Sequence, residues 1–267
     1  MVILIQVLPV LLYAALVAFR VRAAAAPAMR LNVGRWLMLV AMLLHAWALW
    51  VQIFPAGGLR FGFAAALSAM MWLALTFYWI ESFFARVDGL QMVALPVAAV
   101  SAALPLAWPG QHAVLAPASL QFQVHFVTAM LAYSLFALAA LHALLMATLE
   151  RQLHRGRLPR ALSGLPPLLT LESLLFRLIQ LAFVFLTITL ASGVLFSESL
   201  FGRALGFTHK SLFAVASWLL FGTLLLGRHL WGWRGRVAIR WTLAGFVALL
   251  LAYVGTRFVL EVVLGRV

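Results

Sequence analysis

The chain has 267 residues, of which 66% are hydrophobic and 9% charged, and its mean hydropathy is +1.09. A soluble domain would carry charge on about a quarter of its residues, so the composition excludes a water-soluble globular protein and indicates an integral membrane protein. No cysteine is present, which excludes disulfides and thiolate metal sites, and the formal charge of +13 then reflects membrane topology rather than nucleic-acid binding.

Eight apolar stretches follow one another along the chain, each bounded by charged residues, proline or glycine. Most have the roughly 17–25 residues that a spanning helix needs. Neighbouring helices can accommodate Pro96 and Pro105 in the fourth, and the fifth is longer than one span. We predict an all-α, polytopic membrane helix bundle of about eight transmembrane helices, which forms a single integral membrane domain over residues 1–267. The stretches are Val2–Phe19, Trp36–Phe54, Phe61–Ile80, Leu90–Leu106, Leu120–Leu149, Leu174–Phe196, Phe207–Leu226 and Ala238–Leu260.

The first stretch is predicted to be a membrane helix rather than a signal peptide. Its leading end carries no positive charge, whereas Arg20 and Arg22 follow the apolar run. That order is the reverse of a secretory signal.

Positive charge is distributed unequally between the two sets of loops. Only five of the 19 lysines and arginines fall in the set that includes Arg60, Arg203, Lys210, Arg257 and Arg266, and the other fourteen fall in the opposite set. Because cytoplasmic loops carry the excess of positive charge, we predict that both termini lie outside. An even number of spans requires the two termini to lie on the same side, and the charge distribution agrees.

Motifs of soluble enzymes are missing from the chain, and its acidic residues are few. The six acids lie mostly near the ends of the predicted spans. A proton or cation pump usually needs ionisable groups deep in the membrane, so this pattern disfavours a coupled transporter. The acids are Glu81, Asp88, Glu150, Glu172, Glu198 and Glu261.

Four of the seven histidines sort by membrane depth. Under this topology the fifth and seventh stretches both run from outside to inside. His125 opens the fifth and His209 the seventh, so both are predicted near the outer surface, whereas His142 and His229 lie toward the inner ends. His209 and His229 are 20 residues apart, or roughly 30 Å along a helix, which is the thickness of the bilayer hydrocarbon.

Two histidines at one depth on neighbouring helices suit a haem iron, which takes axial imidazoles from opposite sides. Zinc is the alternative metal, but structural zinc needs four ligands, and neither cysteine nor matching carboxylates complete such a set. The small residues Thr128, Ala129 and Ala132 share a helix face with His125. Either a planar macrocycle or another helix could cover that face.

Helix geometry argues against one iron shared by His209 and His229. At about 100° per residue, His209 and His229 point to nearly opposite faces of their helix. We therefore predict that His125 and His209 bind haem iron at an outer site, that His229 binds haem iron at a separate inner site, and that His142 is a further cofactor-binding residue. The alternative for His142 and His229 is an amphipathic anchor at the membrane interface.

Two segments carry a family resemblance: "VHFVTAMLAYSLFALAALHALL" and "THKSLFAVASWLLFGTLLLGRHLWGWRGR" with the apolar stretch that follows it. They resemble the cytochrome c assembly protein family, the CcsA- and CcmC-like haem-handling membrane proteins, and most closely its short HemX/YpjD-like branch. The resemblance is strongest over about residues 120–260. It implies that His125, upstream of an Ala-Tyr pair, and His229, before the Gly-Trp-Arg-Gly turn, are haem ligands in a bacterial cytoplasmic (inner) membrane protein.

The chain also departs from the family's haem-delivery members. Those members carry a tryptophan-rich, aspartate-ended motif in an outer loop, whereas "SESLFGRALGFTHK" here contains neither residue. A second external histidine near the C-terminus is missing from "RFVLEVVLGRV" as well. The resemblance therefore implies haem association without haem-lyase chemistry, so we do not expect an enzyme.

We expect a membrane haem-binding protein, with haem b as the cofactor, that assists cytochrome c biogenesis or haem trafficking through bis-histidine ligation near the outer face. The expected partners are haem, the lipid bilayer and other cytochrome c assembly or membrane proteins, not nucleic acid. Two alternatives stay open: a non-catalytic membrane regulator or scaffold of haem biosynthesis or of another membrane complex, and a small-molecule transporter.

The charge asymmetry makes a testable prediction about topology. A reporter fused after Pro109 should report an outside location, one after Pro159 an inside location, and one at the C-terminus an outside location, because loops rich in lysine and arginine stay in the cytoplasm. Alkaline phosphatase and green fluorescent protein fusions would measure this, and a cytoplasmic C-terminus would contradict the predicted orientation.

Overall fold

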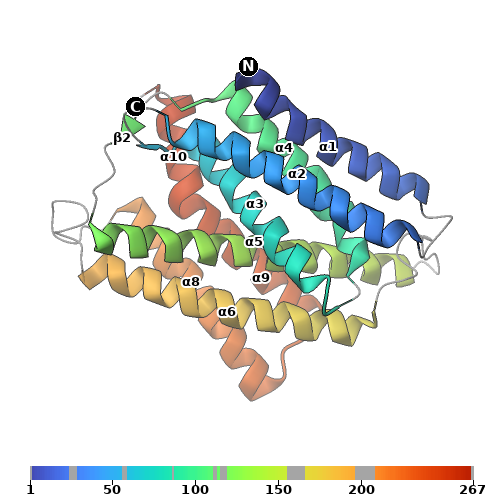
Figure 1. The fold of residues 1–267 in the computed structure, drawn as a ribbon. Helices are drawn as coiled ribbons and strands as arrows, with labels where there is room; N and C mark the ends of the chain where they lie inside the picture. Colours follow the sequence, from blue (N-terminus) through green and yellow to red (C-terminus); the bar gives the residue numbers. More distant parts are fainter. Residues whose placement is uncertain are drawn as a thin grey trace.

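The computed structural model describes residues 2–23, 29–55, 59–85, 87–110, 113–114, 119–154, 166–195 and 208–265. Within these ranges, eight helices are long and apolar enough to cross a membrane, and they pack into one bundle (Figure 1). The predicted all-α bundle is confirmed. Its elements are α1 (Val2–Ala23), α2 (Met29–Ile53), α3 (Phe63–Glu81), η1 (Asp88–Leu90), α4 (Gln91–Ala107), α5 (Leu120–His154), α6 (Leu168–Leu195), α8 (His209–Trp231) and α9 (Arg236–Leu250), the last continued by η3 (Leu251–Gly255), α10 (Thr256–Phe258) and η4 (Val259–Val263).

Helices dominate because lipid offers no hydrogen-bond partners, so a spanning backbone must satisfy its own polar groups. The only strands in the described part of the chain are β1 (Leu59–Arg60) and β2 (Ala113–Val114), which pair antiparallel between two outer loops. α4 stays helical although Pro96 and Pro105 lie within it. The described beginning of α1 and end of η4 lie at the same end of the bundle (Figure 1), as eight spans require.

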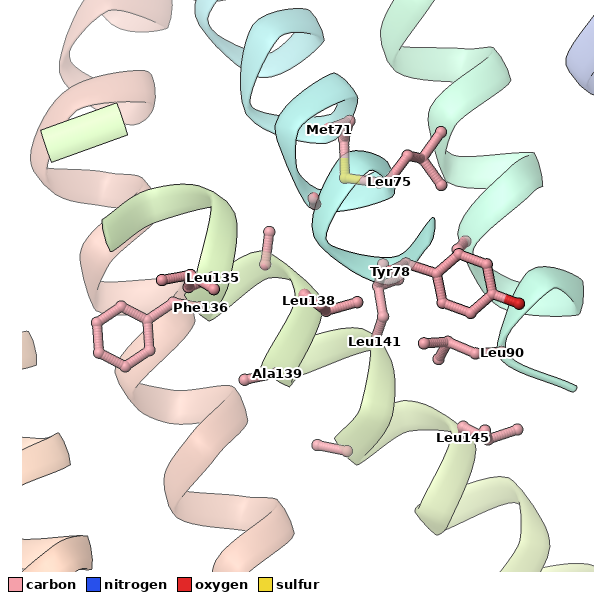
Figure 2. Close-up of a cluster of buried hydrophobic side chains, with 14 of the residues drawn as sticks. Met71, Leu75, Tyr78, Leu90, Leu135, Phe136, Leu138, Ala139, Leu141 and Leu145 are labelled. Atoms are coloured by element: carbon pink, nitrogen blue, oxygen red, sulfur yellow. The ribbon is translucent and has the colours of Figure 1, made fainter. Parts of the chain in front are cut away.

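α5 is the central helix of the bundle. It has 35 residues, packs against α3, α6 and α9, and is buried along most of its length from Ala132 inward. Figure 2 shows Met71, Leu75 and Tyr78 of α3 in one buried cluster with leucines of α5. α1 and α2 complete the other side of the bundle, with α1 lying along α4.

The α8–α9 hairpin has defined ends. α8 begins with a capping box, in which the Thr208 hydroxyl accepts a hydrogen bond from the Ser211 amide while the Ser211 hydroxyl accepts one from the Thr208 amide. α8 ends at Trp231 and is followed by Gly232, whose φ of +65° lies in the left-handed region that favours glycine. Trp233 then folds back so closely over Gly227 that a side chain there would collide with its ring.

Glu172 of α6 fixes this hairpin at its inner turn. One carboxylate oxygen accepts a hydrogen bond from Nη1 of Arg228 at 2.6 Å, and the other accepts one from the Gly235 amide at 3.0 Å. The Arg228 guanidinium also lies 4.6 Å from the ring centre of Phe176 and donates to the Trp233 carbonyl. Glu172 is almost fully buried, where an unpaired charge would be costly. Both partners stabilise its charge.

Glu261 of η4 supplies the N-terminal cap of α3. The residue before α3 is Gly62, which has no capping side chain, and the Phe63 amide donates instead to the Glu261 carboxylate at 3.2 Å. Tyr253 of η3 adds a second link, because its hydroxyl donates to the Phe61 carbonyl at 3.2 Å. The last span is therefore attached to the outer end of the third.

A glycine on α9 allows three helices to meet. Phe221 of α8 is fully buried, stacks on Phe136 of α5 with ring centres 3.7 Å apart, and rests on Gly245 of α9. A methyl group at Gly245 would lie 2.8 Å from the Phe221 ring, which is closer than packed atoms approach.

Gly245→Ala should destabilise the protein by about 1–3 kcal/mol, since an overfilled core forces side chains and backbone to shift. Gly222→Ala is the matched control, because its new methyl group would meet Phe183 at an ordinary 3.4 Å and alanine favours a helix by about 1 kcal/mol. Thermal unfolding in detergent measures both. Equal unfolding temperatures for the two variants would show that the contact does not limit packing.

Candidate functional site

His125 lies in the second turn of α5, where it is half-buried and hydrogen-bonded to α6. Its Nδ1 is 2.9 Å from the hydroxyl oxygen of Ser192, and that hydroxyl donates to the Thr189 carbonyl at 3.0 Å. Since the serine proton is directed to the carbonyl, Ser192 accepts from His125, which places a proton on Nδ1. The neutral ring then carries its lone pair on Nε2, as a metal-binding imidazole requires.

The helix face around His125 divides into an open part and a packed part. Thr128 and Ala129 are half-exposed, whereas Ala132 is fully buried in the helix core. None of the residues from Leu120 to Leu131 is buried. The small-residue face therefore serves helix packing at Ala132 and stays accessible nearer the outer end. On α6, Gly193 lies beside the His125 ring, where an added Cβ would meet Cε1 at an ordinary contact distance of 3.4 Å.

His209 is the first residue of α8 and is exposed. It follows the Thr208 cap, and the next residue, Lys210, places its ammonium 5.8 Å from the ring centre of Tyr253. His125 and His209 lie at the same end of the bundle, on two helices that both pack against α6. Their joint ligation of one iron stays a prediction.

The two inner histidines occupy different environments. His229 is exposed in the last turn of α8, two residues before the exposed Trp231. His142 is fully buried, with Nδ1 3.0 Å from the Leu138 carbonyl and Nε2 3.3 Å from a carboxylate oxygen of Glu81. Both ring nitrogens of His142 thus face protein groups, so a cofactor could bind that ring only by displacing Glu81.

A buried polar chain links α1, α2 and α3, and sequence reasoning did not single it out as a unit. The Nδ1 of His45 is 3.2 Å from the Tyr13 hydroxyl, and Nε2 is 2.8 Å from the Ser68 hydroxyl. All three side chains are almost fully buried. The available signal was His45 itself, since an ionisable residue in the middle of a span is rare and usually has a partner.

Metal sites with several protein ligands receive no support in the described ranges. No three histidine, aspartate or glutamate side chains gather there, and the sequence has no cysteine. A metal held by two imidazoles, as in haem, needs no such cluster.

The fold and these sites define a polytopic helical membrane protein with histidines at both ends of its spans. Comparison with known proteins identifies its family: the sequence profile of the family described as cytochrome C assembly protein matches residues 31–264. The chain belongs to this family, as predicted.

Among individual proteins, the chain is 29% identical over 265 residues to inner membrane protein YpjD of Escherichia coli strain K12, an alignment that covers 96% of this chain and all of that protein. It is also similar to the cytochrome c biogenesis proteins CcsA of Gloeobacter violaceus and Prochlorococcus marinus strain MIT 9301. The Gloeobacter protein is 28% identical over 92 residues, which cover 34% of this chain and 27% of that protein. The Prochlorococcus protein is 33% identical over 88 residues, which cover 33% of this chain and 28% of that protein. No solved structure matches significantly. The chain is a multi-pass protein of the bacterial inner membrane.

Proposed function

We propose that this protein binds haem b at the outer end of the bundle and assists cytochrome c biogenesis or haem trafficking without catalysis of its own. Membership of the cytochrome c assembly family and similarity to proteins named for cytochrome c biogenesis support the biological role. The observation that carries the haem proposal is the bond between His125 and Ser192, which leaves the lone pair of the ring on Nε2.

The residues at the outer end fit a haem. His125 and His209 would supply the axial imidazoles, and the accessible small residues Thr128 and Ala129 offer a face on which a flat ring can lie. When bound, haem supplies an iron that accepts two such ligands and carries one electron. The part of this chain is to hold and orient the ring, and Ser192 keeps the proton of His125 on the nitrogen away from the iron.

The proposal assigns the inner site one histidine. His229 is accessible at the end of α8 and stays a candidate ligand there. His142 is left out, because Glu81 faces its Nε2. The loop that corresponds to the family's tryptophan-rich motif lies mostly outside the described residues, and its sequence contains no tryptophan; we therefore propose no haem-lyase activity.

The absorption spectrum of the purified protein loaded with haem tests this proposal. The wild type should show a low-spin bis-histidine spectrum, and His125→Ala or His209→Ala should each convert it to high-spin or abolish binding, because one axial ligand is lost. His229→Ala should leave the outer signal unchanged. His154→Ala is the matched control, since that exposed ring lies beside Glu150 and Arg236. A protein that binds no haem would instead favour the regulator or scaffold.

Ser192 offers a second prediction. Ser192→Ala removes the acceptor for the Nδ1 proton of His125 and should weaken haem binding by about 10–100-fold, the usual effect of losing the partner that orients a metal-binding histidine. Ser192→Thr keeps the hydroxyl and should therefore bind haem with most of the wild-type affinity and with a reduction potential close to that of the wild type. Ser134→Ala is the control, since the Ser134 hydroxyl donates to the Met130 carbonyl within α5. Equal affinities for the alanine and threonine variants would show that the bond only aids packing.

A further inference from the structure

The turn between α8 and α9 is held in one conformation by three hydrogen bonds. The Trp233 amide donates to the Gly227 carbonyl at 3.1 Å, and the Arg228 guanidinium donates to the Trp233 carbonyl at 3.1 Å. The Gly235 amide donates to the Glu172 carboxylate at 3.0 Å. The turn lies at the periphery of the bundle, at the bottom of Figure 1. The side chains that it carries therefore project from a fixed backbone.

Three tryptophan rings follow one another at this turn. The ring centres of Trp231 and Trp233 are 5.8 Å apart, and those of Trp233 and Trp241 are 5.2 Å apart. Trp231 is exposed, whereas the other two are half-buried. Because tryptophan prefers the level of the lipid headgroups, this row of rings places the turn at the surface of the inner leaflet.

Four arginines lie in or beside the same turn, and only two of them have an acidic partner. Arg228 and Arg236 each pair with a glutamate. Arg234 and Arg240 are exposed, and neither forms a hydrogen bond or an ion pair with the described part of the chain. Two guanidinium groups beside the tryptophan row therefore keep a positive charge that the protein does not balance.

The surroundings of the turn offer one abundant counter-charge, the phosphate of a lipid headgroup. A guanidinium group fits a phosphate with two parallel hydrogen bonds. A zwitterionic headgroup already balances its phosphate with its own ammonium group, so an uncompensated positive patch favours an anionic phospholipid. Topology alone needs basic residues in the inner loops, but it needs neither a fixed turn nor stacked rings.

We propose that the α8–α9 turn binds the headgroup of an anionic phospholipid of the cytoplasmic leaflet. Arg234 and Arg240 contact the headgroup, and the exposed ring of Trp231 lies against the lipid beside it. Arg228 stays paired with Glu172 and holds the turn in shape. The site is independent of haem binding, because the proposed outer haem site lies at the other end of α8.

Native mass spectrometry of the full-length protein, titrated with phosphatidylglycerol or phosphatidylcholine, tests the proposal. The first phosphatidylglycerol should bind the wild type about 25-fold more tightly than phosphatidylcholine, since each basic residue near an anionic headgroup contributes about fivefold. In the double variant Arg234→Gln, Arg240→Gln this ratio should fall close to one. Arg60→Gln is the matched control: it removes an exposed positive charge at the outer end and should leave the ratio unchanged.

A lysine variant separates a headgroup site from charge alone. Arg234→Lys together with Arg240→Lys keeps both charges, and with them the topology, but loses the forked donor geometry. Its ratio should lie between those of the wild type and the glutamine variant. If the glutamine variant does not insert, the lysine variant carries the test. A lysine variant with the wild-type ratio would overturn the proposal, because a general positive surface would then explain the binding.

Two further outcomes would also reject the lipid site. Equal affinities of the wild type for the two lipids would leave an acidic protein segment as the occupant of the turn. Inorganic phosphate distinguishes a lipid from a free anion: phosphatidylglycerol should raise the thermal unfolding temperature of the wild type more than that of the glutamine variant, whereas millimolar phosphate should raise neither. The same stabilisation by phosphate as by the lipid would contradict the proposal.

Discussion

The structure depends on one constraint: in lipid, every backbone amide and carbonyl must find its partner within the protein. Helices satisfy this in their interiors and fail at their ends, and two buried or half-buried glutamates accept from amides at helix starts. Glu172 accepts from the Gly235 amide and from Arg228, and Glu261 caps α3. Glu150 joins α5 to α9 through Arg236, and Glu81 joins α3 to α5 through His142. Each of these four carboxyl groups connects two helices distant in sequence.

The number and order of the spans could be predicted from the sequence because hydropathy reports which segments prefer hydrocarbon. The helix ends could not. α5 continues beyond the predicted Leu149 to His154, and α8 continues to Trp231, because a helix propagates into the headgroup region wherever its residues allow. The central position of α5 in the bundle could not be predicted from the sequence either. A soluble helix reveals its buried side by its apolar stripe, whereas a membrane helix is apolar toward lipid and protein alike.

The candidate site was predictable only in part, for a related reason. The depth of His125 follows from its place at the start of a span, but its partner Ser192 is one of many hydroxyl residues in spans and has no distinguishing pattern. His142 was predicted as a cofactor-binding residue because it lies near the inner end of α5. Its contact with Glu81 depends on how α3 packs against α5, and nothing in either segment alone specifies that pairing. His45 is similar, since Tyr13 and Ser68 reach it from two other helices.

The bond from the Phe63 amide to Glu261 also has a meaning for biosynthesis. The third span leaves the ribosome long before the eighth, so its outer end enters the membrane without a cap and stays incomplete until the eighth span has been made. The Tyr253 hydroxyl, which reaches the Phe61 carbonyl, arrives at the same late stage. The order of synthesis therefore makes the eighth span the one that completes the outer end of α3, because it supplies both contacts and is made after the third.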